Sequence, residues 1–303
     1  LNLVQFIDNV FEFKKSGSSK FVILRLDGPI YLVRGKDAAI DRLLKKFTDI
    51  FVDGIIFQSN WSLRHNKSEF GIKAPFETMI YNSSDNEKFN GFNCKEFVPD
   101  NKINLISSSW SDNARKGFYF YQYLDQNLNF DKYKMTFVGN SPIKFRNIKQ
   151  IPPVNSAELA EILKKHDIFV FASRNEPCSN ALLEALACGL PVVALDSGSN
   201  RELIKMGGEV FSDSVEMIQK IDVISNNYRQ YQSQIPEYRI SVSSDLYLQF
   251  FERLYSEVIA DRYSPKRITL ESYLKFLGIK FFLGLFMAWN SFTVRVSRLC
   301  RKR

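Results

Sequence analysis

Two glutamates eight residues apart, Glu176 and Glu184, are the part of this sequence that most clearly suggests chemistry. Glu184 is the only charged residue between Ala181 and Val193, in a stretch with a helical pattern. A helix that is apolar nearly all round is usually buried, and a buried carboxylate is costly unless it has a partner or binds a proton. Such a carboxylate can accept paired hydrogen bonds from neighbouring hydroxyl groups, as on a ribose. The spacing alone also fits a salt-bridged helix glutamate and an ordinary loop glutamate.

The elements around these glutamates are predicted to be a strand, a loop, a helix and a second strand. The runs Ile168–Ala172 and Pro191–Leu195 are apolar without alternation, which is typical of strands buried on both faces of a parallel sheet. The helix pattern between them ends at Gly189, just before a proline, which is a common stop signal. The segment Asp167–Glu202 is therefore expected to be a right-handed βαβ unit. Its first loop, which contains Glu176, lies at the strand end where open α/β sheets bind ligands.

The whole stretch, Glu176-x7-Glu184 and then EALACGLPVVALDSGSNRE, resembles the donor-site signature of the family-four retaining glycosyltransferases (glycosyl transferases group 1). The resemblance implies the α/β GT-B fold, in which two Rossmann-like domains face a cleft. It implies that Glu184 binds the ribose hydroxyls of a nucleotide sugar and that Glu176 lies beside the sugar at the reaction centre. Ser179, Asn180 and Ala181 would face the sugar and phosphates at a helix N-terminus, where amide dipoles favour anions.

Basic residues after an earlier strand are expected to contact the diphosphate. Lys116 and Gly117 match the lysine–glycine pair that opens a helix in most relatives, whereas Ser108 and Ser109 replace a glycine–arginine pair. Arg115, beside Lys116, can supply the missing charge, since guanidinium and ammonium groups both suit phosphate oxygens. Without the resemblance, these residues would also fit a solvated basic turn.

Two other loops are expected to line the site. Gly139 and Asn140 follow the predicted strand Lys134–Val138, where a glycine lets the backbone approach a ligand, and the family uses this loop near the base and phosphates. Earlier in the chain, Asp27 falls where many members carry a catalytic-pocket histidine, which is absent here. Asp27 or Arg25 is expected to substitute for it, although this segment equally fits a simple turn.

The chain divides into three predicted segments. Residues 1–99 are expected to form a partial, acceptor-side Rossmann-like domain, residues 100–260 a nucleotide-sugar-binding domain, and residues 261–303 a basic amphipathic helical tail. A GT-B N-terminal domain normally opens with several βα units before the patterns seen here. For a domain of about 150 residues, roughly 60–90 residues with most of the acceptor site are therefore expected upstream.

The net charge of +8 comes entirely from the tail, because residues 261–303 contain ten Lys and Arg and only two acids. The remainder is neutral overall, which argues against nucleic acid as the main partner. The uncharged part of the tail, Phe281–Val294, is shorter than the roughly 18–20 residues of a membrane-spanning helix. Its aromatic and basic composition favours an anionic membrane surface, although a helix packed on the protein also fits.

The remaining composition indicates a cytoplasmic protein. The four cysteines have neither metal-ligand spacing nor a disulfide framework, and the chain has only two histidines. No Asp-x-Asp pair is placed to hold a metal. We therefore expect no metal and no cofactor other than the nucleotide sugar, which is a substrate.

The resemblance implies transfer of a sugar from a nucleotide sugar to an acceptor hydroxyl with retained anomeric configuration. The acceptor is expected to be a glycan or a lipid-linked sugar in cell-surface polysaccharide or glycolipid synthesis, at the inner face of the membrane. Two alternatives stay open. A sugar-nucleotide epimerase of the same fold would need an additional acid/base group that we do not identify. A non-catalytic sugar-nucleotide-binding scaffold subunit is favoured by the serines at positions 108–109 and the missing histidine.

Overall fold

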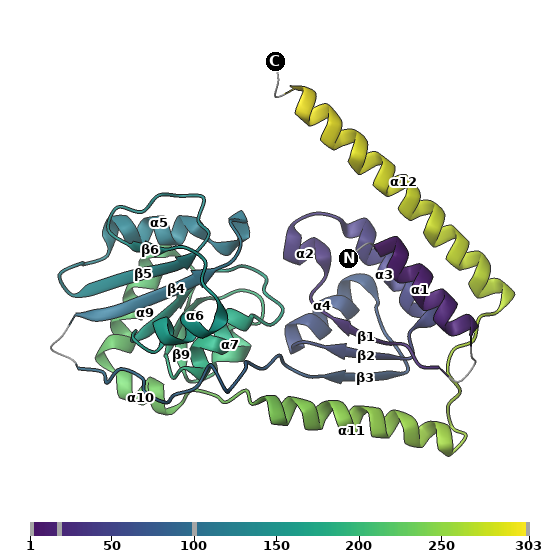
Figure 1. Cartoon of the computed structure of the whole chain (residues 1–303), viewed down its shortest axis with the longest axis horizontal. Helices are drawn as coiled ribbons and strands as arrows, with labels where there is room; N and C mark the ends of the chain where they lie inside the picture. Colours follow the sequence, from purple (N-terminus) through teal and green to yellow (C-terminus); the bar gives the residue numbers. More distant parts are fainter. Residues whose placement is uncertain (1–2, 17–19, 99–101, 301–303) are drawn as a thin grey trace.

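The computed structural model describes residues 3–16, 20–98 and 102–300, with the backbone alone for residues 3–4 and 286–300. These residues form two α/β domains, each built around a parallel sheet with helices packed against it (Figure 1). The first domain contains the strands β1 to β3 and the second the strands β4 to β9. The loops that carry the predicted site residues lie where the two domains meet.

The second domain has a Rossmann-type sheet. Its strands lie in the order β6-β5-β4-β7-β8-β9, all parallel, so the order of connection reverses between β4 and β7. The strands are β4 (Ile103–Ser109), β5 (Tyr133–Gly139), β6 (Lys149–Ile151), β7 (Ile168–Phe171), β8 (Val192–Leu195) and β9 (Gly208–Phe211). The helices are η1 (Ala114–Lys116), α5 (Phe118–Asn127), α6 (Ser156–Leu163), α7 (Asn180–Ala187), α8 (Asn200–Ile204), α9 (Ser214–Asn226) and α10 (Tyr228–Ser233).

Two hydrophobic cores lie on opposite faces of this sheet. Along β7, Ile168 and Val170 pack into the core with α5 and α9, whereas Phe169 and Phe171 pack into the core with α6, α7 and α8. All four side chains are buried. Alternate residues of one strand thus enter different cores, which explains why the run is apolar without interruption.

The first domain has a smaller parallel sheet in the order β1-β2-β3. Its elements are α1 (Leu3–Lys15), β1 (Ile23–Leu26), α2 (Ile30–Arg34), α3 (Ala38–Phe51), β2 (Gly54–Phe57), α4 (Asn60–Phe70) and β3 (Phe76–Met79). Strand β1 pairs with β2 through Leu26, which lies opposite Phe57. It therefore ends two residues later than the predicted strand Lys20–Leu24, and Asp27 follows it directly.

Helix α11 (Ile240–Ile259) packs on the first domain. Its buried residues Phe250 and Leu254 share a core with Ile56 and Phe76 of β2 and β3. Figure 1 shows this helix running beside β3. The packing therefore differs from the predicted second domain of residues 100–260, because the chain has already returned to the first domain at α11.

Helix α12 (Leu270–Cys300) begins as part of the first domain's core. Phe276, Ile279 and Leu283 are buried with residues of α1 and α3, and the ring of Phe276 stacks on that of Phe11 with centroids 4.2 Å apart. The packed-helix alternative for the tail is therefore observed over this part of α12. The side chains beyond residue 285, including those of most of the predicted uncharged stretch, lie outside the described residues.

Candidate functional site

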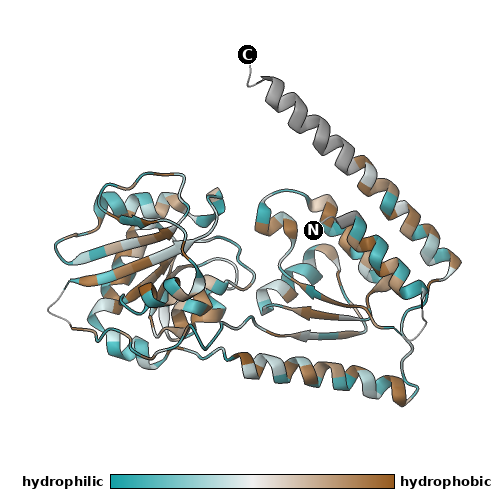
Figure 2. Cartoon of the chain, viewed as in Figure 1, coloured by the Kyte–Doolittle hydropathy of each residue, from teal (hydrophilic) through white to brown (hydrophobic). Residues whose placement is uncertain are grey.

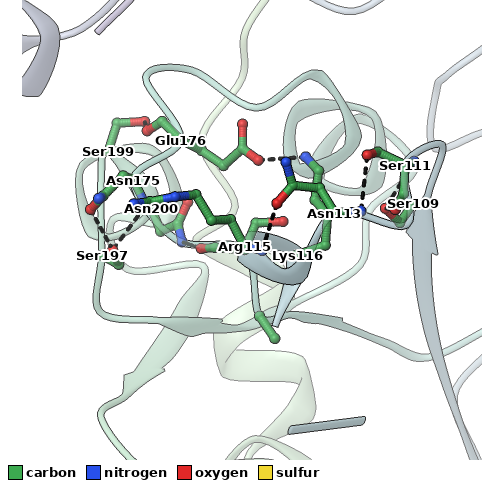
Figure 3. Close-up of polar contacts among 12 residues, drawn as sticks. Ser109, Ser111, Asn113, Arg115, Lys116, Asn175, Glu176, Ser197, Ser199 and Asn200 are labelled. Atoms are coloured by element: carbon green, nitrogen blue, oxygen red, sulfur yellow. Dashed lines mark hydrogen bonds and ion pairs between the residues drawn. The ribbon is translucent and has the colours of Figure 1, made fainter. Parts of the chain in front are cut away.

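An ion pair forms where the carboxyl ends of β4 and β7 lie side by side. Lys116, in the short helix η1 after β4, places its Nζ 2.5 Å from Oε1 of Glu176, in the loop after β7 (Figure 3). Gly117 ends η1 with φ of 75°, and any Cβ there would collide with the carbonyl oxygen of Ala172. A backbone bond of 2.9 Å from Arg174 N to Arg115 O joins the same two segments. The close approach of these loops brings together two predicted catalytic residues.

The Glu176 loop is held by the loop between β8 and α8. The backbone N–H and the hydroxyl of Ser199 both donate to the carbonyl of Glu176, at 2.9 and 3.1 Å. Gly198 lies so close that a Cβ would be 2.5 Å from Glu176 N. The buried Asn200 donates to Ser173 O at 3.1 Å and thereby ties α8 to the same loop. Figure 3 shows these residues gathered around Glu176, so this loop positions the predicted catalytic carboxylate.

Asp27 contributes a carboxyl group from the first domain. Its Oδ1 accepts a hydrogen bond from the side chain of Gln58, which follows β2. Burial raises the pKa of Asp27, the charge of Glu176 raises it further, and Arg25 and Arg34 act in the opposite direction. Where the resemblance would place a histidine, this chain therefore has an exposed carboxyl group with a raised pKa.

Arg115 is directed to the other domain. Its Nη1 donates to Leu32 O at 2.7 Å, and Nδ2 of Asn175 donates to the same oxygen at 3.0 Å. Leu32 lies in α2, close to the helix C-terminus, where carbonyl oxygens carry partial negative charge and attract cations. The two neighbouring basic residues thus have different partners: Lys116 contacts Glu176, whereas Arg115 links the two domains.

Helix α7 carries the remaining predicted donor residues from the Glu176-x7-Glu184 motif. Ser179 is its N-cap residue, Asn180 its first residue, and the half-buried Ala181 packs beside the adjoining core. Oδ1 of Asn180 accepts a hydrogen bond of 2.8 Å from the side chain of Asn82, in the segment that follows β3. The N-terminus of α7 therefore faces the first domain.

Glu184 lies one helical turn beyond Asn180. Burial alone raises the pKa of its carboxyl group from 4.5 to about 7. Among the described residues, no hydrogen bond or ion pair of its side chain joins it to Glu176 or Lys116. It is the partly buried helix carboxylate that the sequence predicts, and its raised pKa reflects the lack of a compensating charge.

Gly139 and Asn140 lie beside the end of β4. Gly139 has φ of 118°, and a Cβ there would collide with Ser109 O. Asn140 donates from its backbone N–H to Ser109 O at 2.9 Å and from its side chain to Trp110 O at 2.7 Å. Both line a hollow of about 590 Å³. The glycine is therefore required by contact between two strand ends, whether or not a ligand also approaches it.

Glu202 is a residue at the domain contact that the motif analysis did not identify as functional. From α8 it accepts hydrogen bonds from the backbone N–H groups of Asn60 and Trp61 at 2.7 and 3.2 Å. It also accepts one from the hydroxyl of Tyr81 at 2.7 Å, and burial together with this bond raises the pKa of that phenol. A carboxylate of one domain thus caps the N-terminus of α4 in the other. Because the contact spans 142 residues, no local pattern could have revealed it.

The described residues contain neither a cluster of metal-ligating side chains nor a membrane-spanning helix. No three His, Cys, Asp or Glu side chains there gather in a group able to hold a metal ion. None of the helices in the same ranges combines the length and apolar character needed to cross a bilayer.

Residues 111–227 match the family model described as Glycosyl transferases group 1. Over 129 residues the chain is 26% identical to a GDP-mannose-dependent alpha-mannosyltransferase of Mycobacterium tuberculosis (strain CDC 1551 / Oshkosh), covering 38% of this chain and 34% of the relative. The chain thus spans about a third of the length of this curated relative.

Several solved structures resemble the fold of this chain. Sucrose-phosphate synthase from Thermosynechococcus elongatus matches with a TM-score of 0.61 at 14% identity, covering 77% of this chain and 68% of that one. Anabaena Alr3699/HepE in complex with UDP and glucose matches with a TM-score of 0.61 at 17% identity, covering 78% and 72%. Together, these comparisons confirm the resemblance to group 1 glycosyltransferases and the GT-B fold.

Proposed function

We propose that this chain contains the donor site of a retaining glycosyltransferase, which moves a sugar from a nucleotide sugar to an acceptor hydroxyl. The observation that carries the proposal is the Lys116–Glu176 ion pair, at the carboxyl ends of neighbouring parallel strands. Two similar proteins support the donor class: one is named as GDP-mannose-dependent and another was solved with UDP-glucose.

The polarity of the ion pair suits the charge that develops during glycosyl transfer. As the bond to the diphosphate breaks, positive charge grows on the sugar ring and negative charge on the leaving group. Lys116 would stabilise the diphosphate and Glu176 would lie beside the ring. Because both side chains are already positioned, their stabilisation would be greatest in the transition state. This fixed positive charge is why we propose a reaction without a bound metal.

The two other carboxyl groups would have separate roles. Asp27 lies on the first-domain side of the cleft, and a carboxyl group with a raised pKa can take up a proton from an acceptor hydroxyl. Glu184 would accept hydrogen bonds from the ribose hydroxyls. Those bonds favour the charged carboxylate, so donor binding should lower the raised pKa of Glu184.

Slow hydrolysis of nucleotide sugars tests the proposal before the acceptor is known. The chain would be incubated with UDP- and GDP-linked hexoses, and the anomer first released would be identified by NMR. We expect turnover of one donor with retained configuration, and a large loss in the Lys116→Ala variant. An inverted product would refute the retaining mechanism.

A non-catalytic donor-binding subunit is the second candidate, and the orientation of Arg115 favours it. In the structure this guanidinium contacts Leu32 O and so links the domains, while serines replace the family's other phosphate-binding pair. Calorimetry on the same donors separates the two candidates. Tight binding of a donor without any hydrolysis or transfer would identify the scaffold function.

A further inference from the structure

Over residues 270–285, where its side chains are described, helix α12 has two apolar faces, and only one of them is covered. Phe276, Ile279 and Leu283 are buried against α1 and α3. On the opposite side, residues spaced three or four apart form a continuous stripe that is 43–75% exposed. This outer stripe consists of Leu270, Leu274, Leu277, Phe281 and Leu285. An ordinary surface helix is polar on its outer side, so the outer stripe requires a different explanation.

The covered face fixes the direction of the outer stripe. Phe276 stacks on Phe11 at 4.2 Å, and Lys280 Nζ lies 2.9 Å from Asp8 Oδ1 of α1. Rotating α12 to bury the outer stripe would break these contacts and expose Ile279 and Leu283, which are 1% and 2% exposed. Figures 1 and 2 show α12 extending away from the domains, with hydrophobic residues recurring along its described part.

The charge of the segment indicates what covers the outer stripe. Near its start the basic side chains are already neutralised, because Lys275 pairs with Glu271 and Lys280 with Asp8. The sequence from Arg295 to the C-terminus then contains five basic residues and no acid. An apolar stripe followed by clustered positive charge is the composition of a helix that lies on an anionic bilayer surface.

Helix α11 shows that exposure alone does not select this partner. It also presents apolar side chains to solvent, including Leu248, Tyr255 and Ile259 at 58%, 64% and 68% exposure. However, α11 contains three acids and a single arginine, and anionic lipid would repel this net negative charge. The two helices therefore offer a matched pair of surfaces with similar apolar exposure and opposite charge.

We propose that the outer stripe of α12 docks on an anionic lipid surface, with the basic C-terminal end beside it. The covered face would then hold the first domain against the membrane, so the acceptor side of the cleft would lie near lipid-linked substrates. This interaction goes beyond the proposed glycosyl transfer and does not depend on it, since binding to lipid can be measured without turnover.

Vesicle sedimentation tests this surface directly. The intact chain should sediment with vesicles of equal parts phosphatidylcholine and phosphatidylglycerol, less with phosphatidylcholine alone, and less in added salt. A variant with Leu274→Gln, Leu277→Gln and Phe281→Gln should bind at least about tenfold more weakly, because three apolar side chains no longer enter the interface. The matched α11 variant, with Leu248→Gln, Tyr255→Gln and Ile259→Gln, should bind like the intact chain.

Several results would overturn the inference. Equal binding by the α12 variant, or loss of binding only in the α11 variant, would place the lipid contact elsewhere. Equal binding to neutral and anionic vesicles would show that attraction to anionic lipid does not contribute to the interaction. If light scattering without lipid shows a dimer that the α12 variant abolishes, the outer stripe is instead an interface between two copies. Unchanged circular dichroism and thermal unfolding in both variants would establish that folding is intact.

Discussion

Replacing Glu184 by glutamine should make the protein more stable at neutral pH while weakening donor binding. Burial raises the pKa of this carboxyl group from 4.5 to about 7, a shift that corresponds to about 3 kcal/mol. The folded state disfavours the ionised form, so the penalty is absent below about pH 4.5, grows as the pH rises, and is complete above about pH 7. Glutamine keeps the shape but cannot ionise, so it should remove the penalty.

Thermal unfolding of both proteins across this pH range measures the effect. The Tm of Glu184→Gln should equal that of the wild type at the acidic end and exceed it by roughly 5–10 °C above pH 7. Glu252→Gln, at an exposed position of α11, provides a control for loss of a carboxylate and should give no such pH-dependent difference. If the Tm difference between Glu184→Gln and the wild type did not change with pH, the conclusion that burial raises the pKa of Glu184 would be refuted.

Donor affinity of the same variant should change in the unfavourable direction. An amide loses charge-assisted hydrogen bonds to the ribose, each worth roughly 1.5–3 kcal/mol, which is about a 10- to 150-fold loss in affinity. Calorimetry at pH 8 measures the donor affinity of the variant and of the wild type. Unchanged affinity would remove Glu184 from the donor site even if the stability prediction held.

Three further outcomes are expected. Lys116→Ala should lower kcat more than it raises KM in steady-state kinetics, since leaving-group charge grows in the transition state, and a change in KM alone would limit Lys116 to ground-state binding. Glu202→Gln should weaken the domain contact by roughly 1–3 kcal/mol, detectable as faster limited proteolysis between the domains, and an unchanged rate would mean that this contact does not hold them together. Truncation after Pro265 removes three buried α12 side chains worth roughly 4–9 kcal/mol and should unfold the first domain; a Tm equal to that of the intact chain would contradict the observed core.

The central βαβ unit was predictable because its pattern is local. Each residue of β7 enters one of two cores, so the run had to be apolar throughout, and β8 follows the same rule. Strand β1 was placed two to three residues too early because Val22 is buried like a strand residue. The backbone N–H of Val22, however, donates to the side chain of Asp53, so a buried carboxylate takes the place of a neighbouring strand as its hydrogen-bond partner. Hydropathy alone cannot distinguish a buried strand residue from a buried residue that precedes the strand.

The site was predictable to the extent that strand order determines it. Lys116 and Glu176 each follow a strand, and because β4 and β7 are neighbours their loops meet. The orientation of Arg115 depends on a carbonyl of α2 that lies 83 residues away in the other domain. The packing of helix α11 on the first domain could not be predicted for a similar reason. Its apolar face could bury against either domain, and only the fold determines which.

If Lys116 and Arg115 bind the donor as proposed, their different partners would couple donor binding to the domain contact. A diphosphate brings two negative charges, and the charge of Lys116 is already balanced by Glu176. Arg115 lies at the domain contact, where its Nη1 donates to Leu32 O at 2.7 Å, so turning that atom to the phosphates would break this bond. Recruiting Arg115 would therefore remove one link between the domains and leave Glu202 as the larger polar contact. Donor binding and domain closure would then compete for one side chain, so the affinity measured for the donor includes the free energy of that exchange.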